Sequence, residues 1–387
     1  MDVKELAKKH KQYVIDMRRE FHKHPEPSWQ EKETSKRIKR ELDAMGIPYR
    51  PVGDPGLVAT IEGAGKGKTV ALRADMDALE VTEANDIDYK SQNEGISHAC
   101  GHDAHMAMLL GAAKVLNESK DQINGTVKLI FQPAEELVSG AVTMIKEGCL
   151  EGVDTIFGIH IVGFLPIGLI CAQEGPRLSS ADHFEIIVKG QGGHGGMPHQ
   201  GVDAVVAGSA VVMNLQSIVS REFDPSESAV VSVGMFNAGT RNNVIADTAR
   251  LEGTVRLFNK ELSAQIAGII ERIAKNTAQS YRAEAELKYT VGVPPTINDP
   301  VCARRAAETV KKIVGPDALF EVPPVTGAED FAFDSEKVPG VFAFLGAGNE
   351  AKGPLFPQHH ENFNIDEDAL ETGTALHVQY ALDFLNE

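Results

Sequence analysis

The sequence has little cysteine, no long apolar run and a deficit of positive charge. Its four cysteines do not have the spacing of a disulfide framework in a chain of 387 residues. Three of them, Cys149, Cys171 and Cys302, are expected to be small buried hydrophobic residues. No run of 18 apolar residues is present, so the sequence predicts no membrane span. The N-terminal stretch lacks the apolar core and cleavage site of a signal peptide, so we expect a cytoplasmic protein.

The charge balance excludes one class of partner. Lys and Arg number 38 against 55 Asp and Glu, which gives a net charge of −17. No Lys/Arg-rich run offsets this acidity, so nucleic acid is not an expected partner. Apolar residues make up 42% and charged residues 24%, as in an ordinary globular protein. The length suits two domains better than one.

The first part of the chain alternates between strand and helix patterns. An N-terminal helix is expected to end at "HPEP", and a second helix covers about 105–119. Strands are expected at 57–62, 69–74, 126–132 and 155–160. Strands that alternate with helices predict an α/β sheet that is covered on both faces.

The pattern changes near residue 180. Strand and helix patterns from "DHFEIIVKG" to "AEAELKY" follow the order βαββαβ, the ferredoxin-like arrangement. The α/β character resumes with a helix at about 300–314, the strand "VFAFLG" and a closing helix from about 366. The sequence therefore predicts a larger domain of residues 1–179 and 293–387, with a smaller domain of residues 180–292 inserted into it.

Polar side chains follow four strands of the larger domain. The strand "TVALRA" leads into Asp75 and Asp77, and "TVKLIFQ" leads to Glu135 and Glu136. The strand "TIFGIH" ends in His160, and a loop after "VFAFLG" reaches a pair of histidines. Ligands of open α/β sheets bind at the carboxyl ends of the strands, so we expect these side chains to converge at one edge. The stretch "HACGHDAH", which contains Cys100 and His102, opens a helix close by.

Thiolate, imidazole and carboxylate groups are together the ligand set for zinc or a similar divalent metal. One of two adjacent glutamates can bind the metal, while the other moves a proton between water and a leaving group. Purely structural interpretations of the acidic residues stay open at this point. The two aspartates could form a turn after their strand, and the two glutamates could be a solvated helix start. His22 and His24 are expected to be ordinary surface or helix-end residues.

The motifs "RADMDAL", "HACGHDAHM", "FQPAEE", "IFGIH", "GQGGHGGMPH" and "GAEDF" resemble those of the M20 family of metallopeptidases and amidohydrolases. The match runs in order from "HKHPEPSWQE" to "HHENFNIDEDAL". The branch that it resembles most is the N-acyl-amino-acid amidohydrolases, which include aminoacylases and hippurate hydrolases. This resemblance implies a zinc-exopeptidase-like catalytic domain with two divalent metal ions (zinc, manganese, cobalt or nickel) and an inserted lid domain that often dimerises.

The resemblance also implies roles for individual residues. The metal ligands would be Cys100, His102, Glu136, His160 and His359, with Cys100 as the bridging ligand. Glu135 would be the general base. Asp77 aligns with an aspartate that orients the base, and Asp75 replaces a metal-binding histidine of the wider family. His359 is preferred to His360 by counting back from Phe363. Asp103 is expected to accept a hydrogen bond from a ligating imidazole, and His98 and His105 are expected not to bind metal.

Three residues of the inserted domain match positions that face substrate in relatives. His194 matches a histidine that reaches the partner's active site in dimeric relatives and stabilises the oxyanion. Asn243 and Arg256 match positions that hold the substrate's amide or carboxylate. Each also has a structural interpretation, since His194 could be a turn residue and Arg256 an exposed strand residue.

The expected function is metal-dependent hydrolysis of the amide bond of an N-acyl amino acid, a small-molecule substrate. An alternative on the same fold is a dipeptidase, a carboxypeptidase or an N-acetyl-diaminopimelate deacetylase. A different class, a metal-binding or assembly protein without catalysis, predicts a damaged site, whereas every expected ligand and both acidic residues are present here. A homodimer through the lid domain is a further expectation.

Overall fold

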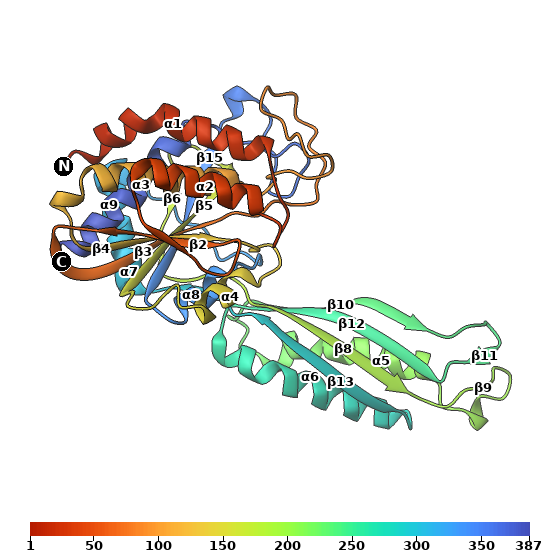
Figure 1. Cartoon of the computed structure of the whole chain (residues 1–387). Coiled ribbons are helices and arrows are strands. Elements are labelled where there is room, and N and C mark those ends of the chain that lie inside the picture. The colour runs from red at the N-terminus through yellow and green to blue at the C-terminus, as the bar shows by residue number, and fades with distance from the viewer. The chain divides into compact units, whose positions relative to one another are not determined.

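The computed structural model describes residues 1–387, and the chain forms two compact units. Unit 1 consists of Met1–Gly175, Ile297–Pro323 and Glu329–Glu387. Unit 2 consists of Pro176–Thr296 and Pro324–Ala328, so it is inserted into the sequence of unit 1 (Figure 1).

Unit 1 contains helices and strands in alternation, as a mixed α/β fold does. Its helices are α1 (Val3–Lys23), α2 (Lys32–Met45), α3 (His102–Glu118), α4 (Gly140–Lys146), α7 (Pro300–Ile313), α8 (Phe331–Ser335) and α9 (Ala369–Leu385). Its strands are β1 (Tyr49–Pro51), β2 (Leu57–Glu62), β3 (Gly65–Asp75), β4 (Asn124–Gln132), β5 (Thr155–Pro166), β6 (Ile170–Cys171) and β15 (Gly340–Gly348), and β14 (Thr296–Asn298) spans the boundary between the units.

The strands of unit 1 form one seven-stranded sheet in the order β1-β2-β4-β3-β5-β15-β6. Its central neighbours β4, β3, β5 and β15 are parallel to one another. Every residue of β15 is buried, and β3 is buried along its second half, as expected for parallel strands with both faces covered. The carboxyl ends of these four strands therefore meet at the same edge of the sheet.

The helices of unit 1 follow from their sequence patterns. Nearly every residue of α3 is buried, because this helix is apolar almost all round and lies between α1, α9 and the sheet. Helix α1 is amphipathic, begins at the capping residue Asp2 and ends before Pro25, as the sequence predicts. The cysteines expected in the core, Cys149, Cys171 and Cys302, are all buried.

Unit 2 contains two α-helices and a four-stranded antiparallel sheet in the order β10-β12-β8-β13. Its elements are β7 (Gly175–Leu178), β8 (Ala181–Lys189), β9 (Gly193–His194), α5 (Ala204–Leu215), β10 (Ala229–Ala238), β11 (Val244–Ile245), β12 (Thr248–Leu257), α6 (Lys260–Ser280) and β13 (Glu284–Val293). Phe184, Ile186 and Val188 alternate along β8 and are buried in a core with residues of α5 and α6.

The helical stretch Ala204–Glu222 in unit 2 is long and apolar enough, by length and composition, to cross a membrane. One such stretch is weak evidence for a membrane span, because a core helix of a soluble protein passes the same test. In the structure it includes α5, which packs on α6 and on the sheet of unit 2.

Candidate metal centre

The candidate centre lies in unit 1, at the carboxyl edge of the parallel strands. Asp75 ends β3, and Asp77 follows it by two residues. The strand β4 ends at Gln132, three residues before Glu135. His160 does not end its strand, as the sequence suggested, because β5 continues to Pro166.

Cys100 and His102 flank Gly101 at the start of α3. Gly101 has a φ of 92°, and a Cβ atom there would lie 2.5 Å from the Ile161 side chain. Glycine is therefore required at this turn, both for the left-handed backbone and for the close approach of α3 to β5.

The candidate ligand atoms form overlapping groups. Cys100 lies in one group with His102 and His160 and in another with Glu136 and His359, and the ligand atoms of each group lie within 4.8 Å of one another. The Cys100 Sγ atom is 3.4 Å from His160 Nε2, and Glu136 Oε1 is 3.6 Å from His359 Nε2. The thiol is thus the common member of two groups.

Two imidazoles turn the same nitrogen toward this cluster. His102 Nδ1 donates to the main-chain carbonyl of Asp77 at 2.9 Å, and His160 Nδ1 donates to the main-chain carbonyl of Ile161 at 2.8 Å. Because a carbonyl only accepts, each ring donates from Nδ1 and directs Nε2 at the cluster, where the neutral ring offers a lone pair. Metal-binding histidines are commonly oriented by such a hydrogen bond from the other ring nitrogen.

Three buried polar atoms of the site have no hydrogen-bond partner: His102 Nε2, Glu136 Oε1 and Asp77 Oδ1. Buried polar atoms without a partner are rare, since each costs the desolvation free energy of that atom. His102 Nε2 is 3.9 Å from Glu136 Oε1. The unsatisfied atoms therefore belong to the same cluster of imidazole, thiol and carboxylate groups.

The electrostatics of the cluster favour positive charge. Burial raises the pKa of Glu135 well above its ordinary value, and the neighbouring Glu329 and Asp330 raise it further. Burial also raises the pKa of Glu136. Burial alone lowers the pKa of His102, but Asp75 and Cys100 outweigh it and raise that pKa overall. A proton or a cation is thus stabilised among these groups.

Asp75 and Asp77 have different partners. Asp75 accepts from Arg73 at 2.7 Å and from His105 Nδ1 at 2.5 Å, so both of its oxygens are occupied. Asp77 accepts from Ser28 and from the amide of Glu136, and its other oxygen lies 3.3 Å from His102 Nδ1. Asp77 therefore contacts His102 and the loop of the glutamate pair, while Asp75 is held by Arg73 and His105 and lies 3.8 Å from His102 Nδ1.

The two late histidines also differ. His359 has a φ of 67°, and its amide donates to the main-chain carbonyl of Ala99 at 2.8 Å, which holds it beside Cys100. His360 instead stacks on the ring of Phe356 with 4.5 Å between ring centroids. The structure places His359 in the cluster and His360 outside it.

The three residues expected to face substrate lie in unit 2. His194 in β9 pairs with Val244 in β11, next to Asn243, and both His194 and Asn243 are exposed. Arg256 is half-buried in β12, opposite Val230 of β10. The structure thus brings His194 and Asn243 together and places Arg256 in the main sheet of unit 2.

Two expectations are corrected by the structure. His22 lies in the last turn of α1 and His24 is its exposed C-cap, but His22 is not a surface residue. His22 is 1% exposed, because its ring nitrogens lie 2.8 Å from Asp103 Oδ2 and 3.1 Å from Glu83 Oε1. Asp103 also accepts from Arg18 at 2.8 Å and does not contact a candidate ligand. Asp103 therefore belongs to a buried ionic network between α1 and α3, and main-chain carbonyls instead accept the hydrogen bonds that the candidate imidazoles donate.

A second buried network escaped the sequence analysis. Arg73 is 2% exposed and binds Asp75, Glu329 and Asp330 at distances of 2.7 to 2.9 Å. Glu329 and Asp330 also form a group with Glu135 in which the carboxylate oxygens lie within 4.8 Å of one another. The signal that could have found this network is an arginine inside an apolar strand, since a buried cation requires buried acids.

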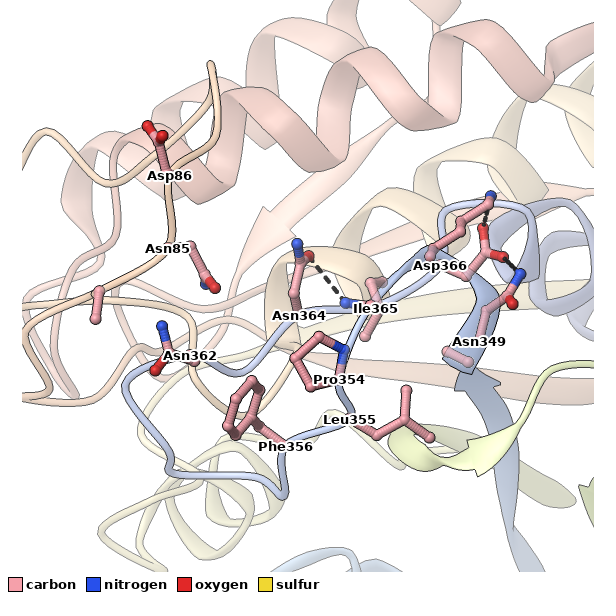
Figure 2. Close-up of a pocket in the computed structure, with 14 residues that line it drawn as sticks. Asn85, Asp86, Asn349, Pro354, Leu355, Phe356, Asn362, Asn364, Ile365 and Asp366 are labelled. Atoms are coloured by element: carbon pink, nitrogen blue, oxygen red, sulfur yellow. Dashed lines mark hydrogen bonds and ion pairs between the residues drawn. The ribbon is translucent and has the colours of Figure 1, made fainter.

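A pocket of about 380 Å³ lies along the loop from Lys352 to Asp366, and Figure 2 shows its lining. Asn85, Phe356 and Asn362 face it, and Asp366 is hydrogen-bonded to Asn349. None of the expected site residues lines this pocket. It is therefore separate from the candidate metal centre.

Comparison with known proteins identifies the family. The family model described as "Peptidase family M20/M25/M40" matches residues 71–383 of the sequence. The "Thermostable carboxypeptidase 2" of Saccharolobus solfataricus is 40% identical over all of this chain and 98% of its own length. The "IAA-amino acid hydrolase ILR1-like 2" of Arabidopsis thaliana is 41% identical over 97% of this chain and 86% of its own length.

A solved structure is similar throughout. The crystal structure of a dinuclear metal binding peptidase from the M20 family of Bacillus subtilis has a TM-score of 0.88 and 36% identity, and the match covers 98% of this chain and 99% of that chain. The family match covers most of the chain, and the similarity to these relatives extends over nearly all of it. The chain therefore belongs to peptidase family M20/M25/M40 and is a hydrolase.

Proposed function

We propose that this protein is a metal-dependent amidohydrolase that cleaves the amide bond of N-acyl amino acids. The observation that carries the proposal is the cluster in which Cys100 is shared between two groups of candidate ligands. The residues that would hold two divalent cations are Cys100, His102, Glu136, His160 and His359, of which Cys100 belongs to both groups. The name of the Arabidopsis relative, an IAA-amino acid hydrolase, supports a conjugate of an amino acid as the substrate class.

The residues present fit a pair of cations. A cation would satisfy His102 Nε2 and Glu136 Oε1, which lack any other partner, and would favour the thiolate form of Cys100. Thiolate, imidazole and carboxylate ligands suit zinc, and they also accept manganese, cobalt or nickel. When bound, such ions polarise the amide carbonyl and make an attacking water more acidic.

The remaining steps belong to the chain. Glu135 is buried and lies 4.0 Å from His102, and it has no part in the set of ligands that we propose. Its carboxylate takes the proton from the attacking water and then gives that proton to the departing amine. Asp77 holds Glu135 indirectly, because it accepts from the adjacent Glu136 amide and orients His102. Asp75 binds Arg73 and His105 and so fixes the side chains that pack around these residues.

We assign the inserted residues 180–292 to a ferredoxin-like lid and residues 1–179 and 293–387 to the catalytic domain. The order of strands and helices in unit 2 supports this assignment. His194 would stabilise the oxyanion of the reacting amide, and such donors contribute on the order of 3 kcal/mol. Asn243 and Arg256 would bind the amide or the carboxylate of the substrate.

The lid also exposes large apolar side chains, which support a homodimer of this enzyme. Val206 and Met213 of α5 are 48% and 70% exposed, and Met235 of the edge strand β10 is 50% exposed. Contact with a second copy of the chain would remove such side chains from water. Sedimentation analysis of Met213→Glu tests the assignment, because a charge on this surface should yield a monomer.

A hydrolysis screen tests the substrate class. Metal-stripped protein would be restored with zinc, manganese, cobalt or nickel and assayed on N-acetyl, N-benzoyl and longer acyl amino acids, with free dipeptides as the comparison. We expect the acyl amino acids to be cleaved and the stripped protein to be inactive. Cleavage of dipeptides alone would show that the chain is a dipeptidase or carboxypeptidase instead.

A further inference from the structure

The loop that carries Glu135 and Glu136 has an unusual backbone. Ala134 and Val138, on either side of the pair, have φ values of 52° and 54°. Residues with a side chain avoid this left-handed region, and a β-branched residue such as Val138 avoids it most. Such a conformation is strained and persists only where the surroundings hold it. Something must therefore hold this loop in place.

Buried carboxyl groups from three distant segments bind main-chain amides of the loop and of the helix that follows it. Asp77 accepts from the amide of Glu136 at 3.0 Å, and Asp330 accepts from the amide of Ala141, at the start of α4, at 2.9 Å. Glu31 accepts from the amide of Ala134 at 2.8 Å. Asp77 and Asp330 already belong to the networks around the candidate metal centre, but Glu31 has no place in the chemistry described so far.

Glu31 is fully buried, and its side chain does not cap the helix that it precedes. It occupies the N-cap position of α2, yet its side chain makes no capping hydrogen bond. Glu26 accepts from the first amides of that helix instead. One oxygen of Glu31 binds Ala134, and the other has no partner. Burial of a carboxyl group with only one hydrogen bond costs free energy. The hydrogen bond from Ala134 should therefore have a function that outweighs this cost.

The residues before Glu31 hold the same region. Ser28 donates to Asp77 at 2.7 Å, and Trp29 Nε1 donates to Ser139 at 3.0 Å. The segment from Ser28 to Glu31 therefore contacts both ends of the loop that carries the glutamate pair. Burial raises the pKa of Glu31 to about 8, so at pH 7 it accepts from Ala134 without adding a negative charge beside Asp77.

We propose that Glu31 is a positioning residue for the reaction, because its hydrogen bond to the Ala134 amide fixes the strained backbone from which the Glu135 carboxylate projects. This inference rests on the proposed function, in which Glu135 moves the proton. Glu31 acts on the reaction through the loop and does not touch the substrate. Loss of the hydrogen bond should lower kcat while the metal ligands and the substrate contacts remain.

A pair of variants separates the hydrogen bond from the packing. Glu31→Gln keeps an uncharged acceptor for the Ala134 amide and should retain kcat within about threefold. Glu31→Met has a similar length but no such acceptor, and its kcat should fall by about 10- to 100-fold, the effect of a misplaced reacting group. KM and metal content should stay close to those of the wild-type enzyme in both. Ser35→Ala is the matched control, since Ser35 donates from the same helix start to the Pro55 carbonyl and does not contact the loop.

Trp29 offers a direct readout, because it is the only tryptophan of the chain and is bound to Ser139 of this loop. Its emission maximum should shift in Glu31→Met and stay unchanged in Glu31→Gln and Ser35→Ala. Wild-type kcat in a folded Glu31→Met variant, or an equal loss in Glu31→Gln, would overturn the proposal.

A measurement on the wild-type enzyme covers the case in which Glu31→Met does not fold. In hydrogen exchange, the peptide that contains Ala134 should be protected, and exchange at the rate of a free loop would refute the positioning role. The outcome for Glu135→Gln keeps the two proposals apart. If Glu135→Gln loses activity but Glu31→Met does not, only the positioning role fails. If Glu135→Gln is fully active, the proposed proton transfer fails.

Discussion

Glu135 and Glu136 are neighbours in sequence with different surroundings. Glu136 is half-buried and lies 3.6 Å from His359, whereas Glu135 is buried beside Glu329 and Asp330. Burial and these acids raise the pKa of Glu135, which suits a group that must hold a proton between two steps. Adjacent glutamates in the sequence predict a division of labour, but only the structure shows which neighbours distinguish the two.

Glu135→Gln is the first test of this difference. The variant keeps the size and burial of the side chain but cannot take a proton. We expect activity to fall by about 100- to 10,000-fold, the usual contribution of general acid–base catalysis. Elemental analysis should find the same metal content as in the wild-type enzyme. Normal turnover would show that another group moves the proton, and a loss of metal would show that Glu135 is a ligand.

Cys100 permits a test by metal removal. Burial raises the pKa of its thiol well above the ordinary value, so the thiol should be protonated until a cation binds. A thiolate bound to metal is shielded from alkylation. Because alkylation needs the thiolate, we expect iodoacetamide at alkaline pH to label Cys100 after removal of metal and to leave it unlabelled in the metal-loaded enzyme, as followed by peptide mass spectrometry. Equal labelling of both forms would exclude Cys100 as a ligand.

At the scale of elements, the start of α3 shows how far the sequence could predict the site. The convergence of strand ends was predictable, because parallel strands place their carboxyl ends at one edge. The partners of Asp103 were not, since Arg18 is 85 residues away along the chain. Likewise, the contact of Arg73 with Asp330 spans 257 residues. A single sequence indicates periodicity and local motifs, but it contains no direct record of such long-range pairs.

The same limit explains the elements that the sequence analysis missed. Helix α2 was not expected, because only Thr34, Ser35, Ile38 and Leu42 of its 14 residues are buried and the rest are mostly charged. Strands such as β6 and β9 contain two residues each, which is too short for a periodic signal. Long strands and helices with a clear apolar pattern, including β2, β4 and α1, lie where the sequence predicts them.

Asp103 now leads to a prediction about the packing of α1 on α3. Asp103 binds Arg18 and His22 in a buried network, and these two groups hold its pKa well below the ordinary range, although burial alone would raise it. Removal of one partner from a buried ion pair costs about 3–5 kcal/mol, because the other charge stays buried. We expect Asp103→Ala to lower the free energy of unfolding in urea by about this amount, while the folded protein still binds metal.

His102→Ala provides the contrast. This substitution removes a candidate ligand and should abolish metal binding with a smaller change in the stability of the metal-free protein. If Asp103→Ala lost metal without losing stability, the original expectation of a direct role beside the ligands would hold after all.

At the scale of the whole molecule, unit 1 buries histidines that must stay neutral. His377 in α9 is 1% exposed and meets the ring of Phe157 edge-on at 5.3 Å. Burial, with a smaller effect of His105, lowers its pKa to about 3. In the unfolded chain a histidine has a pKa of about 6.5. Between these two values the unfolded chain binds a proton that the folded chain does not.

The contribution of His377 to the free energy of unfolding should therefore be fully present above pH 6.5 and be lost as the pH is lowered toward 3. For one such histidine the slope is at most about 1.4 kcal/mol per pH unit. His377→Leu removes this group, so its stability should fall less steeply than that of the wild-type protein. Urea unfolding at pH 6.5 and pH 5.0 gives the loss of stability of each protein over this range. The loss should be up to about 2 kcal/mol larger for the wild-type protein than for His377→Leu. His24→Leu, at an exposed position, is the control and should follow the wild type. Parallel losses in wild type and His377→Leu would mean that the acid sensitivity of the fold comes from other groups, such as the buried His98 or the half-buried His160, whose pKa values are also lowered.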